Sequence, residues 1–198
     1  MRIIGGKCRG LTLASVGKGD QAAHLRPTSD RVRESLFNVL AGGRFGDPVD
    51  GAIVLDLFSG TGALALEALS RGAASATLVD DGRTAQKLIR DNISRCRMED
   101  KTQLLPRDAT RLPPRSASQP PATLVFLDPP YSKGLGLKAL AHAITQDWIA
   151  AEALIVWEES TAQTAPEGCT LLDQRRYGDT WITFLKAAPH LPKTGVES

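Results

Sequence analysis

The sequence predicts an α/β fold built on a mostly parallel, doubly wound sheet that ends in an antiparallel pair of strands. Three observations carry this prediction. Short apolar runs at 52–57, 76–79, 102–105 and 122–127 alternate with helical segments, a glycine turn follows the first run, and carboxylates follow several runs. Alternation of strands with helices is typical of parallel sheets, whose ligands bind where the strands end. We therefore expect a binding edge at the carboxyl ends of these strands.

The N-terminal part predicts a small hairpin followed by a helix. Residues 2–12 contain short β-prone pieces broken by three glycines, which is typical of a hairpin or a curled pair of strands. Thr28 or Ser29 is placed to cap a helix that extends to about residue 40. Its expected apolar stripe consists of Val32, Leu36, Val39 and Leu40. A neighbouring polar stripe, which could face either solvent or the binding edge, consists of Arg31, Ser35 and Asn38.

The rest of the chain continues the alternation of helices with strands. The expected later elements are helices at 62–69, 83–96 and 135–148 and strands at 152–157, 171–176 and 180–186. Gly178 marks the turn of the terminal antiparallel pair. Residues 107–121 form an expected loop whose proline- and serine-rich stretch is a surface insertion rather than a separate domain.

Length and composition predict one compact enzyme domain. The chain has 198 residues, of which 42% are hydrophobic, and no apolar run reaches the length of a membrane span. Its start lacks the apolar stretch of a secretory signal, so we expect a cytoplasmic protein without a membrane partner. Cysteines and histidines are too scattered to predict disulfides, a metal site or a nucleophilic triad. We expect no metal cofactor and a monomeric state.

The tetrapeptide Asp128-Pro129-Pro130-Tyr131 follows the run at 122–127 and constrains the chemistry most tightly. It forms a rigid loop rich in hydrogen-bond acceptors, because Asp128 offers carboxylate oxygens and both prolines keep a carbonyl but lack an N–H. Tyr131 adds a flat ring on which a nucleobase can stack. Such a loop suits an aromatic amine, and we expect its four residues to be catalytic. The plain alternative is a strand end followed by a Pro-Pro turn.

Positive charge is concentrated near the N-terminus. The whole chain carries a net charge of +2, but residues 1–45 hold eight Lys or Arg against three Asp or Glu, a balance of +5 that leaves −3 elsewhere. A basic module beside an acceptor loop for an amine favours a nucleic-acid partner over an ordinary solvated surface. The side chains expected to contact the nucleic acid are Lys7, Arg9, Arg26, Arg31 and Arg33.

The glycine turn and the carboxylates at the strand ends predict a cofactor site. Gly60 and Gly62 allow close approach of the backbone at a helix start, and their spacing also satisfies the dinucleotide fingerprint, so NAD is an alternative. Asp56 favours S-adenosylmethionine, because a carboxylate here repels a pyrophosphate but attracts an ammonium and a sulfonium. Asp80 is expected to accept ribose hydroxyls, and Asp108 the adenine amino group. The alternative is that Asp56, Asp80 and Asp108 are merely polar residues at the ends of strands and bind no cofactor.

Several strings of the sequence resemble the RsmD family of bacterial methyltransferases. They are RIIGG at 2–6, LRPT at 25–28, DRVRESLFN at 30–38, LDLFSGTG at 55–62 and DPPY at 128–131. The N-terminal strings are far more specific than the glycine turn or the acceptor loop. The likeness runs in the same order from residue 2 to about residue 186.

The resemblance implies a Rossmann-like, seven-stranded methyltransferase fold that binds S-adenosylmethionine. It places the methionyl end near Asp56, Phe58, Ser59, Gly60 and Gly62, the ribose at Asp80, adenine at Asp108 with Ala109, and the target base at 128–131. Members usually carry Glu-x-Asp after the second strand, whereas this chain has Asp80-Asp81-Gly82, which leaves open whether Asp80 or Asp81 takes the ribose. The charge balance and the composition of the chain together lead us to expect three parts: a basic, RNA-facing extension at 1–45, a methyltransferase domain at 46–187 and a flexible tail at 188–198.

The resemblance also implies the reaction. It is methylation of the exocyclic N2 amine of one guanine in 16S ribosomal RNA, during small-subunit assembly. Asp128 and the Pro129 carbonyl are then expected to accept the two amine hydrogens while Tyr131 stacks on an extruded base. The nearer alternative is adenine-N6 methylation of DNA or RNA, since the same loop suits that amine. An NAD-dependent dehydrogenase and a non-catalytic nucleic-acid-binding protein are the remaining alternatives.

Overall fold

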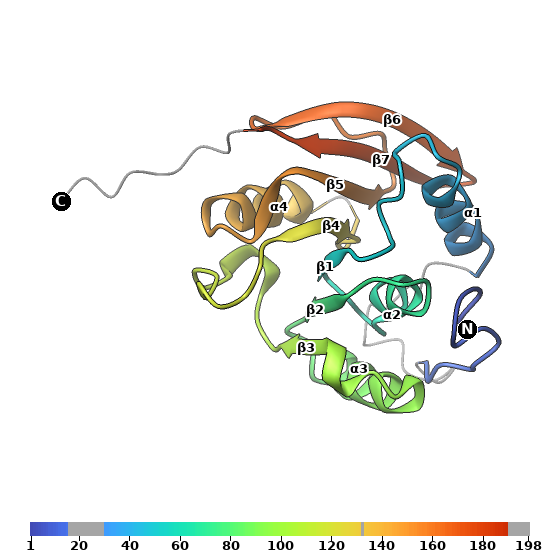
Figure 1. The fold of residues 1–198 in the computed structure, drawn as a ribbon. Coiled ribbons are helices and arrows are strands. Elements are labelled where there is room, and N and C mark those ends of the chain that lie inside the picture. Colours follow the sequence, from blue (N-terminus) through green and yellow to red (C-terminus); the bar gives the residue numbers. More distant parts are fainter. Residues whose placement is uncertain (16–29, 132, 190–198) are drawn as a thin grey trace.

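The computed structural model describes residues 1–15, 30–131 and 133–189. Seven strands form one sheet in the order β3-β2-β1-β4-β5-β7-β6 (Figure 1). The strands are β1 (Ile53–Leu57), β2 (Ser75–Val79), β3 (Thr102–Leu105), β4 (Ala122–Leu127), β5 (Ile149–Glu159), β6 (Cys169–Tyr177) and β7 (Thr180–Ala187). The α-helices of the described residues are α1 (Asp30–Ala41), α2 (Ala63–Ser70), α3 (Arg83–Cys96) and α4 (Leu135–Thr145). Strands β1 to β5 pair in parallel and β5, β7 and β6 pair antiparallel, which confirms the predicted sheet.

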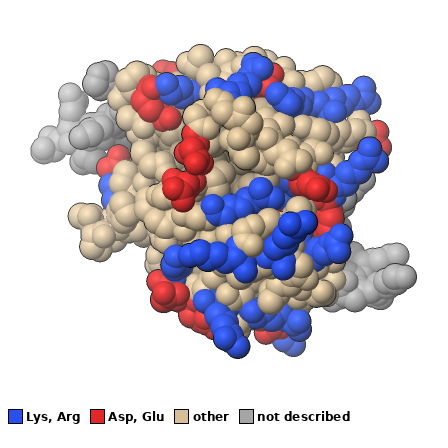
Figure 2. Space-filling model, turned by 45° about the vertical axis from the view of Figure 1, so that its right-hand side comes forward, with Lys and Arg blue, Asp and Glu red and all other residues tan. Residues whose placement is uncertain are grey.

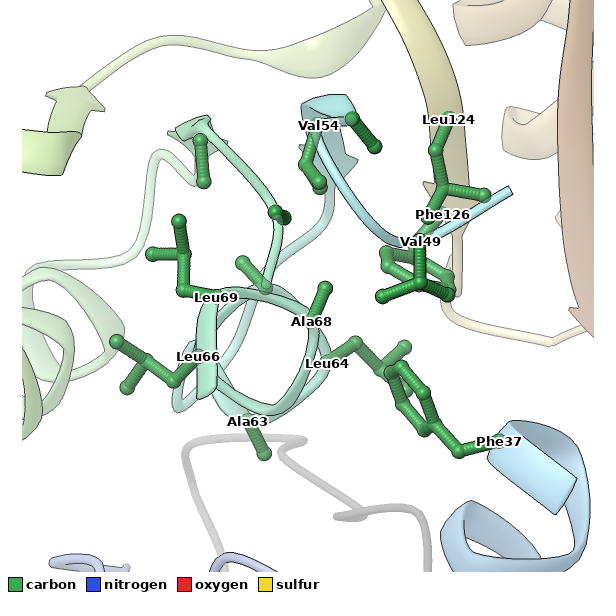
Figure 3. Close-up of a cluster of buried hydrophobic side chains, with 14 of the residues drawn as sticks. Phe37, Val49, Val54, Ala63, Leu64, Leu66, Ala68, Leu69, Leu124 and Phe126 are labelled. Atoms are coloured by element: carbon green, nitrogen blue, oxygen red, sulfur yellow. The ribbon is translucent and has the colours of Figure 1, made fainter. Parts of the chain in front are cut away.

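Alternation along the strands divides the hydrophobic core into two layers. Val54 and Phe126 belong to one buried cluster, and their neighbours Leu55 and Leu127 belong to another. Because successive side chains of a strand point to opposite faces, each cluster covers one face of the sheet. Helices α1, α2 and α3 supply the first cluster and α4 the second. Figure 3 shows Leu64 of α2 next to Phe37 of α1, with Val54, Leu124 and Phe126 of the sheet above them.

Two predicted element boundaries are wrong. The helix expected at 135–148 ends at Thr145, because Asp147 has a φ of 65° and Trp148 turns back to donate its backbone N–H to the Ala143 carbonyl at 2.9 Å. The fifth strand accordingly begins at Ile149 rather than at 152. A left-handed residue that is not glycine leaves little trace in the sequence, which explains the error.

The buried face of α1 also differs from the expected stripe. Leu36 and Leu40 are buried as predicted, but Val32 and Val39 are only half-buried. Arg33 and Phe37 take their place on the core side, with 0% and 1% of their surface exposed. The Phe37 ring lies 5.9 Å from that of Phe126 in the sheet. From the sequence alone, Arg33 is expected to face solvent, since arginine is almost never fully buried without a partner.

The N-terminal segment is anchored along α2 instead of extending away from it. Arg2 and Thr12 form an antiparallel bridge, so the predicted hairpin is present as a short closed loop. The Glu67 carboxylate of α2 accepts the backbone N–H groups of Ile4 and Gly5, each at 2.8 Å. Farther along the loop, the Lys7 N–H donates to the Ser70 carbonyl at 2.8 Å. Residues 1–13 thus share the core of the main domain.

The described residues form neither a membrane-spanning helix nor a cluster of metal ligands. None of their helices combines the length and the apolar character needed to cross a bilayer. No group of three or more His, Cys, Asp or Glu side chains among those residues is arranged to hold a metal ion.

Candidate active site

The predicted residues lie around the end of the central strand β1. Leu57, its last residue, pairs in parallel with Val79 of β2 on one side and with Leu127 of β4 on the other. Asp80 and Asp128 follow these two neighbours directly and therefore flank the glycine turn that follows β1. The arrangement is the edge at which parallel α/β sheets bind ligands.

The turn after β1 is a cradle of backbone atoms at the start of α2. Phe58, Gly60 and Gly62 have φ values of 62°, 57° and 76°. A Cβ atom added to Gly62 would lie 2.8 Å from a leucine methyl group of β2, so both conformation and space require glycine there. The Ser59 hydroxyl donates to the Asp56 carbonyl at 2.6 Å and fixes the turn to its strand.

Asp56 is the buried carboxyl of this site. Only 1% of the residue is exposed, and Oδ2 accepts the Ala65 N–H at 3.2 Å. Burial raises the pKa of Asp56 to about 7, and the nearby Asp80 carboxylate raises it further while the Ala65 hydrogen bond opposes the shift. A carboxyl group with this pKa gains or loses its charge near neutral pH.

Titration of Asp56 should make the folded protein less stable as the pH rises. The pKa is raised in the folded state, so between about pH 4 and pH 7 the folded protein binds the Asp56 proton more tightly than the unfolded chain does. We expect the free energy of unfolding of the wild type, relative to Asp56→Asn, to fall by about 3 to 4 kcal/mol across this window and then level off. Urea unfolding of both proteins at pH 4.5 to 8.5 measures this difference. A difference independent of pH would contradict the assignment.

Asp80 and Asp81 occupy different environments. Both carboxylate oxygens of Asp80 accept backbone N–H groups at 2.9 Å, one from Gly60 of the glycine turn and the other from Gly82. Burial is the main cause that raises the pKa of Asp80. Asp81 is exposed. Asp80 is therefore the carboxylate that the fold ties to the glycine turn.

Asp108 and Ala109 lie after β3, at the same edge of the sheet. The Asp108 carboxylate accepts the N–H and the hydroxyl of Thr110 at 2.8 and 2.7 Å, and so caps a short 3-10 helix. Ala109 is buried against the second hydrophobic cluster. The half-exposed Asp108 carboxylate and the buried Ala109 side chain thus give this part of the candidate site a polar and an apolar surface.

The acceptor loop follows β4 as predicted from the sequence. The Asp128 N–H approaches the Leu57 carbonyl at 3.4 Å, Pro129 is buried and Pro130 is exposed. The Tyr131 hydroxyl donates to Glu158 Oε1 at 2.9 Å. Burial and then the Glu158 carboxylate raise the pKa of the Tyr131 phenol above its ordinary value, so Tyr131 is uncharged at neutral pH.

Glu158 was not predicted as a site residue. It lies near the carboxyl end of β5 with 6% of its surface exposed, although it is separated from Tyr131 by 27 positions in the chain. The signal that could have identified it is the pair of glutamates that ends the apolar run of β5. Thr180, at the start of β7, completes this wall with its hydroxyl 3.4 Å from that of Tyr131.

The predicted basic residues divide into three groups. Lys7, Arg9 and Arg31 are exposed, and Arg26 lies outside the described residues. The prediction that Arg33 contacts RNA is wrong, because the side chain is completely buried. Its guanidinium donates to the Arg2 carbonyl and pairs with Asp30 at 2.9 Å. The reason is that Arg33 lies on the core side of α1, where it stabilises the N-terminal loop.

Solved structures define the class of this fold and site. The structure described as "Putative methyltransferase yhhF from Escherichia coli" superimposes with a TM-score of 0.76 at 31% identity, covering 96% of this chain and 99% of that one. A putative methylase from Haemophilus influenzae gives a TM-score of 0.73 at 27% identity, covering 94% of this chain and 98% of that one. The class is the Rossmann-like, S-adenosylmethionine-dependent methyltransferase fold, as predicted.

The chain belongs to the family whose model is described as "Conserved hypothetical protein 95", which matches residues 1–186. "Ribosomal RNA small subunit methyltransferase D" of Escherichia coli (strain K12) is 36% identical over 166 residues, covering 84% of this chain and 78% of that protein. "Putative rRNA methyltransferase YlbH" of Bacillus subtilis (strain 168) is 32% identical over 191 residues, covering 94% and 98%. The predicted membership of the RsmD family is confirmed.

Proposed function

We propose that this protein methylates the exocyclic N2 amine of a guanine in 16S ribosomal RNA, in the cytoplasm, as a monomer that acts during small-subunit assembly. The observation that carries the proposal is that the acceptor loop at Asp128 directly adjoins the glycine turn, through the pairing of Leu57 with Leu127. A methyl donor held by the turn then lies next to an amine held by the loop. The relatives named as ribosomal RNA methyltransferases support the same substrate class.

The residues of the edge fit a cationic methyl donor. S-adenosylmethionine supplies an activated methyl group on a sulfonium, next to an ammonium and an adenosyl group. Asp56 is positioned to favour these positive charges, the glycine turn to approach the methionyl end, and Asp108 with Ala109 to hold the adenine. A buried carboxyl at this place is unfavourable for the pyrophosphate of NAD, which argues against the dehydrogenase alternative.

Methyl transfer to an aryl amine needs help because the nitrogen lone pair is delocalised into the ring. Asp128 and the Pro129 carbonyl accept the two amine hydrogens, which favours a pyramidal nitrogen with its lone pair directed at the methyl carbon. The new N–C bond forms as the S–C bond breaks, and one amine proton leaves to Asp128 or to water. The ring of Tyr131 stacks on the base after it leaves its helix or loop.

Methylation of ribosomal RNA and small subunits from a strain that lacks the protein tests the function. Each is incubated with labelled S-adenosylmethionine and the purified protein, and the nucleosides are then separated. N2-methylguanosine in the 16S RNA is the expected product. N6-methyladenosine would replace the proposal by the adenine alternative. Calorimetry with S-adenosylmethionine, NAD and NADP tests the cofactor class independently.

A second prediction concerns the ribose of the cofactor. We propose Asp80 as the acceptor of the ribose hydroxyls, because its carboxylate is held against the glycine turn while Asp81 faces solvent. Asp80→Ala should weaken binding of S-adenosylmethionine by about 100-fold, since hydrogen bonds to a charged group contribute about 1.5 to 3 kcal/mol each. Asp81→Ala is the matched control and should change the affinity for S-adenosylmethionine by less than 3-fold. Calorimetry measures both affinities, and the opposite ranking would reassign the ribose to Asp81.

The third prediction concerns RNA binding along α2 and α3. The Cys8 thiol lies 3.7 Å from the Cys96 carbonyl, so the tip of the N-terminal loop contacts the end of α3. The contact places basic residues of the loop near those at the end of α3. We call these exposed residues the basic surface: Lys7, Arg9, Arg95 and Arg97. Figure 2 shows Lys and Arg gathered on the face that carries the N-terminal loop and α3. We propose that this basic surface binds RNA phosphates.

The basic surface lies away from the reacting edge. The Thr61 hydroxyl beside the glycine turn donates to the Met1 sulfur at 3.8 Å, whereas Lys7 contacts Ser70 at the opposite end of the eight-residue α2. The two points are thus about 12 Å apart along the helix. Arg9→Ala/Arg95→Ala should raise KM for 16S RNA about 10-fold at 0.15 M salt with kcat unchanged, and should reduce the salt slope of binding by about 1.5. Lys138→Ala/Arg176→Ala, which removes two exposed cations elsewhere, should leave both values unchanged.

A further inference from the structure

Glu158 and Asp128 lie at the same edge of the sheet, each directly after one residue of a paired couple. Leu127 of β4 pairs in register with Trp157 of β5, so Asp128 and Glu158 are the next residues of two adjacent strands. Trp157 belongs to the cluster covered by α4, so Glu158, the next residue of β5, points to the opposite face of the sheet, the one on which Asp56 lies. The Tyr131 hydroxyl donates to Glu158 Oε1, and Asp128 belongs to the same four-residue loop as Tyr131, so this loop brings Asp128 into the neighbourhood of Glu158.

A carboxylate at this point distinguishes the two candidate bases. The edge of guanine that carries the N2 amine also presents N1–H, a second donor next to the amine. Adenine presents an N1 acceptor next to its N6 amine instead. An ionised carboxylate only accepts hydrogen bonds. It therefore pairs with the guanine edge and opposes the N1 lone pair of adenine.

We propose that Glu158 determines the specificity of the reaction by accepting N1–H of the target guanine while Asp128 and the Pro129 carbonyl accept the N2 amine. The hydrogen bond from the Tyr131 hydroxyl at 2.9 Å orients the Glu158 carboxylate for this contact. With 6% of Glu158 exposed, little water competes at this position, and a mismatched base leaves buried polar groups unpaired. This inference rests on the proposed function and names the group that selects the base.

Replacement of the target guanine by 2-aminopurine isolates the N1 contact. This base keeps the exocyclic amine but has an unprotonated N1, so it presents a lone pair where guanine presents N1–H. The wild type should methylate RNA with guanine at the target at least 100-fold faster, in kcat/KM, than the same RNA with 2-aminopurine. Glu158→Gln should slow the guanine reaction and reduce the ratio to below about 5, because the glutamine amide can donate to N1.

The Tyr131→Phe variant distinguishes the choice of base by Glu158 from the hydrogen bond that orients Glu158. This variant removes the hydrogen bond to Glu158 but keeps the carboxylate and the ring, so the preference for guanine should stay above 10-fold even if kcat falls. Equal rates of the wild type on the two bases would overturn the role of Glu158 and leave the proposed function intact, and this test needs no variant. An unchanged ratio in folded Glu158→Gln would also overturn it. If the wild type forms no N2-methylguanosine at all, the proposed function fails first.

Discussion

Asp128→Ala should lower kcat for methyl transfer by about 10³-fold or more and change the affinity for S-adenosylmethionine by less than 3-fold. Removal of one preorganised hydrogen-bond donor from an oxyanion hole costs about 10²- to 10³-fold in kcat. We expect the loss of a preorganised acceptor to cost as much, and the loss of a proton acceptor to add to it. We expect the affinity to be preserved because the proposed cofactor contacts come from the glycine turn, Asp56 and Asp80 rather than from the loop after β4. Single-turnover kinetics with labelled cofactor and calorimetry measure the two quantities.

The controls for Asp128→Ala come from the same molecule. Asp128→Asn keeps one acceptor oxygen but turns an amide N–H₂ toward the target amine, so it should be nearly as inactive as the alanine variant. Asp179→Ala removes an exposed carboxylate from the turn between β6 and β7 and should leave kcat unchanged. Activity of Asp128→Ala within 5-fold of the wild type would show that the carboxylate has no part in the reaction.

Glu67→Gln should lower the free energy of unfolding by about 3 to 5 kcal/mol, the usual cost of breaking a buried ion pair. Glu67 has no exposed surface and accepts from Ile4 N–H, Gly5 N–H and the Arg71 guanidinium at 2.7 to 2.8 Å. The buried Arg33 guanidinium lies 3.8 Å from Glu67 Oε2. A glutamine would present a donor to at least one of these donors and would remove the negative charge opposite Arg33. Urea unfolding measures the loss.

A double-mutant cycle identifies the cause of this loss. Arg33→Met removes the buried cation, so Glu67→Gln added to it should cost clearly less than Glu67→Gln in the wild type. Glu34→Gln, at an exposed position of α1, is the matched control and should change stability by less than about 0.5 kcal/mol. Additive losses in the double variant would mean that Glu67 acts through the N-terminal backbone and Arg71, without Arg33.

Local patterns in the sequence predicted most of the fold and the place of the main candidate site residues at one edge of the sheet. The sheet and the glycine turn follow from apolar runs and from glycine spacing, which act within a few residues. The placement of Asp56, Asp80 and Asp128 at one edge follows as well, because parallel strands that end in carboxylates must bring them together. The two shifted boundaries at Thr145 and Ile149 depend on a left-handed aspartate, whose conformation the sequence hardly marks.

By itself, the chain's order of residues determined the sheet, the glycine turn, the loop at 128–131 and the edge at which the carboxylates lie. Only the tertiary structure decided that Arg33 is a buried partner of Glu67, that Asp80 rather than Asp81 adjoins the glycine turn, and that Glu158 lies beside Tyr131. Each of these depends on burial or on contacts between distant segments. Charge and polarity are readable from the residue type, but the environment that gives a charged group its role is created only when the elements pack together.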